Sequence, residues 1–332
     1  MSNADAIHLD YGASRSWHAL VLGRAGMDLY PQPDGCKIKD AVSFSSDLGG
    51  SAANIAVAIA RAGARVGLIS ALSDDAVGQF VRQRLQQAGV DISLTINTTG
   101  NERTSLALAE VRNTDCDVVI YRNNPADLKL QCSDPIKQAL AEASNLVVTG
   151  TSLIDPDSRR HTLEIMSHAH DTDCQVWLDL DYRAWNWPSL EITRAVYNEA
   201  AALARVLIGN DEEFAVLSDD FDAQIEQSRQ RNQLLVLKRG AEGACLFAGE
   251  ARLDSGIYPL DPLKPYGSGD AFLGNLLVHY MQTGDWLEAV DAASAAAALV
   301  VSQRGCASAM PTPDQLESLQ QRQNMSPAAT WS

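Results

Sequence analysis

The sequence predicts an α/β protein with a central, mainly parallel sheet flanked by helices on both faces. Two observations predict this class. Short apolar runs alternate with amphipathic helical segments along most of the 332 residues, as in chains where crossover helices join parallel strands. These apolar runs are continuous rather than interleaved with polar residues, which is typical of strands buried on both faces.

The first half of the chain supplies the first elements of this sheet. Residues 19–23, 66–70 and 146–150 are predicted strands because each is a short apolar run. Residues 52–62 and 76–88 are predicted helices, and each is followed by a glycine that can close the helix in a left-handed conformation.

Two stretches interrupt the alternation, at residues 28–48 and 104–124. In the second, the β-like runs 105–111 and 118–121 are separated by a polar turn, which predicts a hairpin. We expect the two stretches to form a small β-rich lid beside the main sheet.

The second half returns to the α/β pattern and completes one domain over residues 16–315. Residues 1–15 look like a tag and leader, which we expect to be disordered, and the polar residues 316–332 predict a loose tail. The elements predicted here are strands at 175–179, 206–209, 234–237 and 244–247, and helices at 159–170, 271–281 and 286–301.

The composition excludes several classes of partner. The chain has 26 Lys and Arg against 42 Asp and Glu, a net charge of −16, whereas binding to nucleic acid or anionic membranes relies on clustered basic residues. We therefore expect neither partner. The six cysteines are scattered without metal-ligand spacing, and no run approaches the ~20 apolar residues of a membrane span. These features predict a cytoplasmic protein.

Several nucleotide and catalytic motifs are absent. The chain has no GxxxxGK[ST] loop, no GxGxxG after its first strand, no HExxH and no GxSxG. A P-loop NTPase and a nicotinamide-dependent dehydrogenase are therefore disfavoured.

The most informative segment is Gly267-Ser268-Gly269-Asp270, which runs straight into a predicted helix. Glycines let backbone N–H groups converge, and a helix start adds unpaired donors, so the segment can hold the charge on a transferring phosphoryl group. Asp270 can accept a proton from an attacking hydroxyl. The same residues also fit an ordinary Gly-rich turn before a helix.

Four further groups are weaker candidates, because each also fits a plain turn or a solvated surface. Gly49 and Gly50 permit close approach of a polyhydroxylated ligand, with Asn54 as hydrogen-bond partner, and two arginines just beyond predicted strands suit a carboxylate. Carboxylates after the strand at 206–209 can organise Mg²⁺ through water, and a Gly-containing turn can approach a nucleotide phosphate. The two arginines are Arg122 and Arg183. The motif after the strand at 206–209 contains Asn210 and Glu213, and the Gly-containing turn contains Lys238, Gly240 and Gly243.

Taken together and in this order, these segments resemble the ribokinase-like (PfkB) carbohydrate kinases over roughly residues 17–315. The resemblance implies ATP-dependent phosphorylation of a sugar hydroxyl, with Asp270 as catalytic base and the backbone of Gly267, Ser268 and Gly269 as anion hole. It also implies a β lid that closes over the sugar.

The resemblance assigns the remaining residues to two ligands. Asp28 and Asn54, at the Gly49-Gly50 turn, would hold sugar hydroxyls; the Lys238–Gly243 turn would bind ATP; and the Asn210–Glu213 motif would serve magnesium and phosphate, with Glu213 reaching Mg²⁺ through water. Relatives commonly carry Asp-Thr where this chain has Lys264-Pro265. That pair helps many of them bind a monovalent cation, so we do not expect a potassium requirement here.

A narrower resemblance concerns the substrate. Residues 23–29, 121–128 and 309–312 look like the branch of the family that phosphorylates 5-dehydro-2-deoxygluconate in myo-inositol catabolism, yielding the 6-phosphate. Arg122 and Arg183 would then bind its carboxylate. The alternatives are a 2-dehydro-3-deoxygluconate kinase, a fructokinase, or a non-catalytic sugar sensor. Lid strands of this family often pair between subunits, which implies a homodimer.

Overall fold

The computed structural model describes residue 9 and residues 15–332. The predicted tag and leader, residues 1–15, thus lie almost entirely outside the described residues. Leu9 is buried, and its backbone N–H donates to the hydroxyl of Tyr280.

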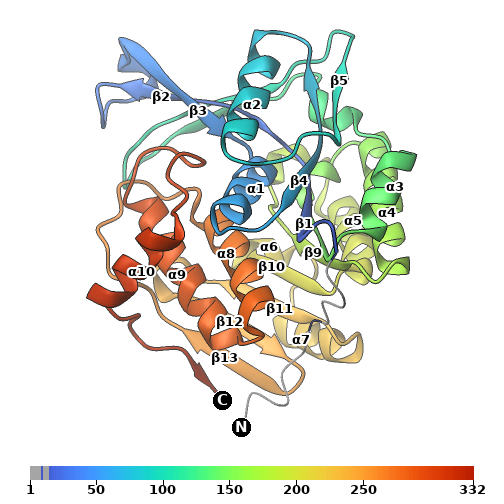
Figure 1. Ribbon diagram of the computed structural model, residues 1–332, viewed down its shortest axis with the longest axis vertical. Helices are drawn as coiled ribbons and strands as arrows, with labels where there is room; N and C mark the ends of the chain where they lie inside the picture. The colour runs from blue at the N-terminus through green and yellow to red at the C-terminus, as the bar shows by residue number, and fades with distance from the viewer. Residues whose placement is uncertain (1–8, 10–14) are drawn as a thin grey trace.

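The described residues form two sheets, and the larger one contains the predicted parallel core (Figure 1). Seven neighbouring strands of this sheet run parallel: β5, β4, β1, β8, β9, β10 and β11. At the β11 edge, β12, β13 and β14 are added antiparallel. The strands in spatial order are β14 (Thr330–Trp331), β13 (Ala251–Ser255), β12 (Ala244–Ala248), β11 (Leu234–Lys238), β10 (Val206–Asn210), β9 (Gln175–Asp179), β8 (Asn145–Thr149), β1 (Ala19–Leu22), β4 (Val66–Ser73) and β5 (Thr95–Thr98).

Helices cover both faces of this sheet, because its buried strands present apolar side chains to both sides. In β1, Ala19 and Val21 belong to one hydrophobic cluster, and Leu20 and Leu22 belong to the other. The first cluster includes residues of α1 (Ser51–Arg61), α2 (Ala76–Gln87), α8 (Ser268–Thr283), α9 (Trp286–Val301) and α10 (Pro313–Arg322). The second involves α3 (Asp134–Ala141), α4 (Pro156–Asp171), α5 (Leu190–Leu203), α6 (Asp211–Ala215) and α7 (Phe221–Gln230).

The smaller sheet has four strands in the order β3-β2-β6-β7, and we call it the lid. Figure 1 shows β2 and β3 projecting from the body of the molecule. The β6–β7 hairpin is antiparallel, as the sequence predicted. The lid strands are β2 (Gly26–Gln32), β3 (Ser43–Gly49), β6 (Ser105–Ala109) and β7 (Val118–Tyr121).

The predicted fold class is confirmed, but the expectation of a loose tail is wrong. Thr312 and Gln315 form a capping box that begins α10, and Leu316 and Leu319 of that helix are buried. Beyond it, β14 pairs with β13 at the edge of the large sheet. Polar composition concealed these elements, since only one face of α10 and two residues of β14 make the contacts. No helix among the described residues is both long and apolar enough to span a bilayer.

Candidate active site

The site forms where neighbouring parallel strands end. Thr149 ends β8 and is the register partner of Asp179, which ends β9. Asn210 ends β10 and is the register partner of Lys238, which ends β11. Parallel strands deliver their carboxyl ends to one edge of a sheet, where ligands of open α/β sheets bind. The α1 and α8 helices begin beside this edge.

Asp270 lies in the first turn of α8 and faces α1. Its Oδ2 accepts a hydrogen bond from Asn54 Nδ2 at 2.8 Å. Burial, and then the nearby charge of Asp179, raise the pKa of Asp270 to about 7, against the opposing hydrogen bond from Asn54. A carboxyl group with a pKa near neutrality is suited to accept and release a proton at physiological pH.

The start of α8 gathers positive character around Asp270. Gly267 adopts a left-handed conformation with φ of +87°, and the helix begins at Ser268. A Cβ on Gly269 would lie 3.2 Å from Nζ of Lys238, so this ammonium sits directly beside the backbone of the turn. Unpaired N–H groups at a helix start together with an ammonium form a site for an anionic group.

Lys238, which the sequence analysis placed in a nucleotide-binding turn, lies against a buried carboxylate. Its Nζ lies 3.1 Å from Oδ1 of Asp179. Burial lowers the pKa of Lys238, but the charges of Asp179 and Glu213 outweigh burial and raise it overall. Burial raises the pKa of Asp179 to about 6, with Lys238 opposing. The structure therefore joins Lys238 to the Asp270 cluster.

Arg183 belongs to the same cluster. Its Nη2 lies 2.9 Å from Oδ1 of Asp181, and its Nη1 lies 3.9 Å from Oε1 of Glu213. Asp181 also accepts a hydrogen bond of 2.6 Å from Ser51 Oγ at the start of α1. The charge of Asp181 raises the pKa of Arg183, with burial opposing.

Asp28 projects from β2 of the lid and is 7% exposed. Burial raises its pKa to about 6, with the charge of Arg24 opposing. The paired glycines are explained by close approach: a Cβ on Gly49 would lie 2.0 Å from Asp28 Oδ1, and a Cβ on Gly50 would lie 2.5 Å from the carbonyl oxygen of Arg24. Gly50 also has a φ of +98°, which favours glycine.

Arg122 is held by residues other than those that hold Arg183. It forms an ion pair with Asp127, and its Nη2 also donates to the carbonyl oxygen of Thr151 at 3.2 Å. Asp127 accepts a further hydrogen bond from Ser105 Oγ.

Asn210 and Glu213 act first on their own helix. Asn210 Oδ1 accepts from the Glu213 N–H at 2.9 Å, and Glu213 Oε2 accepts from the Asn210 N–H at 2.8 Å, a reciprocal capping box that begins α6. Across residues 15–332, no three His, Cys, Asp or Glu side chains are grouped to hold a metal ion. Glu213 Oε1 takes no part in the capping box and lies 3.9 Å from Nη1 of Arg183.

Gly240 and Gly243 lie in the turn that joins the antiparallel strands β11 and β12. Gly243 has a φ of +87°, and a Cβ there would lie 1.9 Å from the Ser255 carbonyl oxygen. A Cβ on Gly240 would meet nothing within 4 Å, so this end of the turn is open.

Lys264 is fully buried beside the turn at Gly267. Its Nζ donates to the carbonyl oxygen of Tyr266 at 2.7 Å and lies 5.0 Å from the centre of the Tyr266 ring. Burial lowers the pKa of Lys264, with the charges of Cys306 and Asp270 opposing. A fixed cationic side chain thus stands next to Gly267.

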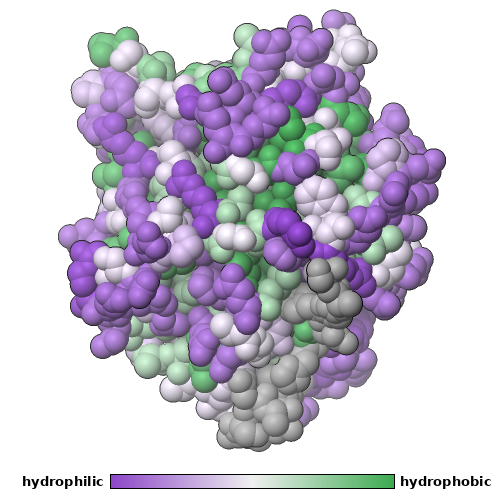
Figure 2. Space-filling model, viewed as in Figure 1, coloured by the Kyte–Doolittle hydropathy of each residue, from purple (hydrophilic) through white to green (hydrophobic). Residues whose placement is uncertain are grey.

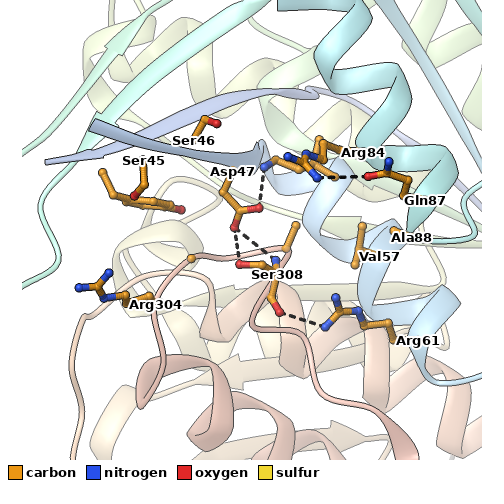
Figure 3. Close-up of a pocket in the computed structure, with 14 residues that line it drawn as sticks. Ser45, Ser46, Asp47, Val57, Arg61, Arg84, Gln87, Ala88, Arg304 and Ser308 are labelled. Atoms are coloured by element: carbon orange, nitrogen blue, oxygen red, sulfur yellow. Dashed lines mark hydrogen bonds between the residues drawn. The ribbon is translucent and has the colours of Figure 1, made fainter. Parts of the chain in front are cut away.

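A cavity of about 370 Å³ separates the lid from the body, between β3, α1, α2 and the loop after α9. Figure 3 shows Asp47 of β3 reaching across it to Ser308, whose Oγ donates to Asp47 Oδ2 at 2.6 Å. Arg61 approaches from α1 and donates to the carbonyl oxygen of Ser308. This contact ties the lid to the body away from Asp270.

Sequence reasoning missed Asp179, Asp181 and Ser51 as individual site residues. The available signal was the pair of aspartates directly after a buried apolar run, a position where side chains meet at the strand-end edge. Ser51 carried no signal of its own, because its contact with Asp181 is made only by the packing of α1.

Comparison with known proteins decides the family. A sequence profile described as pfkB family carbohydrate kinase matches residues 18–313. The chain belongs to this family. A 5-dehydro-2-deoxygluconokinase of Photobacterium profundum is 37% identical over 311 residues, covering 91% of this chain and 94% of the relative. One of Geobacillus thermodenitrificans is 33% identical, covering 90% and 91%.

A solved structure supports the same assignment. The fructokinase of Xylella fastidiosa with bound ATP has a TM-score of 0.82 and 26% identity, covering 92% of this chain and 98% of that one. The predicted carbohydrate-kinase activity is therefore confirmed, as is the predicted resemblance to the 5-dehydro-2-deoxygluconokinases of this family.

Proposed function

We propose that this PfkB kinase transfers the terminal phosphoryl group of ATP to 5-dehydro-2-deoxy-D-gluconate and forms its 6-phosphate. The observation that carries the proposal is the partly buried Asp270, with its pKa of about 7, at the start of α8 beside Lys238. The relatives with 30–37% identity, which are 5-dehydro-2-deoxygluconokinases, support the substrate.

In the proposed reaction Asp270 accepts the proton of the attacking hydroxyl. The hydroxyl oxygen forms a bond to the γ-phosphorus of ATP, the bond from that phosphorus to the bridging oxygen breaks, and ADP leaves. The N–H groups of Gly267, Ser268 and Gly269, with the ammonium of Lys238, stabilise the charge on the transferring group. The lid excludes water, which would compete as acceptor.

The nucleotide is proposed to bind along the β11–β12 turn, with Lys238, Gly240 and Gly243 near its phosphates. Asn210 and Glu213 would hold Mg²⁺ through water. When bound to the ATP phosphates, Mg²⁺ neutralises part of their charge. The Lys264 ammonium supports turnover without added potassium, because it already supplies a positive charge next to the turn.

The substrate is proposed to lie between the lid and the start of α1. Asp28 and Asn54, where Gly49 and Gly50 permit close approach, would hold the sugar hydroxyls. The sequence analysis proposed two arginines for the substrate carboxylate. One is Arg183, which is paired with Asp181, and the other is Arg122, which follows β7 and is paired with Asp127.

The test is ADP release from Mg-ATP with 5-dehydro-2-deoxygluconate, 2-dehydro-3-deoxygluconate, fructose and ribose, each with and without K⁺. We expect the first acid to give the highest kcat/KM and K⁺ to leave it unchanged. Preference for fructose, the substrate named for the Xylella fastidiosa structural relative, would overturn the substrate assignment. Sugar binding without ADP release would identify a sensor instead.

A further inference from the structure

The arginines around the site differ in what already holds their guanidinium groups. Arg122 is paired with Asp127 and bonded to the Thr151 carbonyl. Arg183 is paired with Asp181. Both therefore enter substrate binding with a carboxylate partner in place, which offsets part of the positive charge that a substrate carboxylate would meet.

Arg24 has no such partner. Its Nη1 is buried, and the described part of the chain offers it neither a hydrogen bond nor an ion pair. Buried polar groups are nearly always hydrogen-bonded, and an arginine with a structural role would hold a carbonyl or a carboxylate. The Nε atoms of Arg112, Arg122 and Arg239 are also buried without a hydrogen-bond partner, but the protein holds another nitrogen of each of these guanidinium groups. Among the described residues no nitrogen of Arg24 is held in this way, which distinguishes it as a group available to a ligand.

The position of Arg24 places it at the substrate side of the site. It lies in the loop between β1 and β2, and its carbonyl oxygen accepts a hydrogen bond from the Ala53 N–H in the first turn of α1. Its side chain runs beside β2, because Nη1 lies 3.3 Å from where a Cβ on Gly26 would stand. Its charge also acts on Asp28.

A second unpaired polar atom lies in the first turn of α1, the turn that Arg24 contacts through its carbonyl oxygen. Asn54 donates through Nδ2 to Asp270, but its Oδ1 is buried without a partner among residues 15–332. The site thus presents an unused guanidinium donor and an unused amide acceptor. A molecule that carries both a carboxylate and a hydroxyl group complements them.

We propose that Arg24 binds the substrate carboxylate and makes the kinase selective for sugar acids over neutral sugars. The inference rests on the proposed sugar-acid kinase function and names a residue outside the sequence-predicted set. Arg122 and Arg183 then act as supporting charges that are already tied to Asp127 and Asp181.

The experiment compares two substrates and several variants. The substrates are 5-dehydro-2-deoxygluconate and the same sugar with a carboxamide in place of the carboxylate. Arg24→Met should lower kcat/KM for the acid about 10- to 100-fold, the cost of losing a charged hydrogen bond, and should change the carboxamide less than about threefold. Arg24→Lys keeps the charge and should recover part of the acid activity.

Three comparison variants make the result specific. Arg82→Met removes an arginine that donates to the Ile96 carbonyl from α2, so it should leave both substrates unchanged. Arg122→Met and Arg183→Met should lower the acid-to-carboxamide ratio less than Arg24→Met does. Retained carboxamide turnover shows that Arg24→Met is folded. If this turnover is lost, the same ratio of kcat/KM values, acid to carboxamide, is measured in Arg24→Gln and Arg24→Lys.

The outcomes separate the two proposals. A wild-type enzyme that does not prefer the acid to the carboxamide overturns the proposed sugar-acid function. A wild-type enzyme that prefers the acid, together with an Arg24→Met variant that keeps this preference, overturns the role of Arg24 alone. Selective loss of acid turnover in Arg24→Met supports both.

Discussion

At the scale of single residues, the site is built from buried charges that balance one another. Asp270, Asp179 and Asp28 all have raised pKa values, chiefly because of burial. Lys238 opposes this effect at Asp179 and remains protonated. Burying charges costs free energy unless partners offset it, so these groups indicate a site shaped for chemistry more than for stability.

Replacing Asp270 by asparagine tests the proposed base. We expect Asp270→Asn to lower kcat by about 10²- to 10⁴-fold, the usual contribution of a positioned base, with little change in KM. The side chain keeps its size and can still bond with Asn54. Steady-state kinetics check this, and near-normal turnover in the variant would remove Asp270 from its role.

The pH dependence of stability gives an independent test. The folded-state pKa of Asp270 is about 7, above its ordinary value of 3.8. The folded protein therefore binds this proton more tightly, and the stability so contributed is lost as pH rises from about 4 to about 7. We expect Asp270→Asn to unfold at a higher temperature than the wild type at pH 8, with a smaller difference at pH 5. If the melting-temperature difference between Asp270→Asn and the wild type is the same at pH 5 and pH 8, the raised pKa of Asp270 is contradicted.

At the scale of elements, Tyr266 joins the Gly267–Gly269 turn to the lid. Its hydroxyl donates to the Glu110 carbonyl oxygen at 2.8 Å, and its ring packs on a cluster of Tyr30, Ala109 and Val111. Its own carbonyl oxygen accepts from Lys264. The residue that precedes Gly267 is thus held from both the lid and the core.

We expect Tyr266→Phe to lower kcat about fivefold, because one neutral hydrogen bond contributes roughly 1 kcal/mol. Amide exchange of residues 267–270 should become faster in this variant. Ser308→Ala is the matched control, since it removes the Oγ hydrogen bond to Asp47 shown in Figure 3, leaves the weaker backbone one, and does not alter the turn. If both variants change exchange at 267–270 alike, general loosening of the lid explains the result instead.

At the scale of the whole molecule, the lid presents an apolar face away from Asp28. Cross-strand register places Leu29, Leu108 and Val119 in one row, and side chains alternate along each strand, so Asp28 points to the other face. Phe44, Val119 and Tyr121 are exposed. Figure 2 shows hydrophobic residues at the outer end of the projecting lid. A second copy of this chain would cover this surface.

We therefore expect a homodimer that forms through the lid. Val119→Glu and Tyr121→Glu should shift the protein toward monomer in sedimentation velocity, because each places a charge in an apolar contact. Ile192→Glu is the control, as this residue of α5 is similarly exposed. A wild-type protein that stays monomeric at high concentration would exclude the dimer.

The sequence by itself determined the fold class, most strands and the glycine-rich start of α8, because these depend on local patterns. Continuous apolar runs identified β1, β8, β9 and β10, and Gly267–Asp270 marked the start of α8. It missed α3, α5, α7 and α10, whose apolar residues are interleaved with polar and charged ones.

Only the tertiary structure decided which polar groups are satisfied. The sequence offered Arg122 and Arg183 as free cations, but folding pairs them with Asp127 and Asp181 and leaves Arg24 Nη1 unpaired. Folding also places Lys238, at the end of β11, beside the turn at Gly269. Burial and long-range charge pairs depend on three-dimensional packing of distant segments, whereas apolar periodicity and turn chemistry are properties of neighbouring residues.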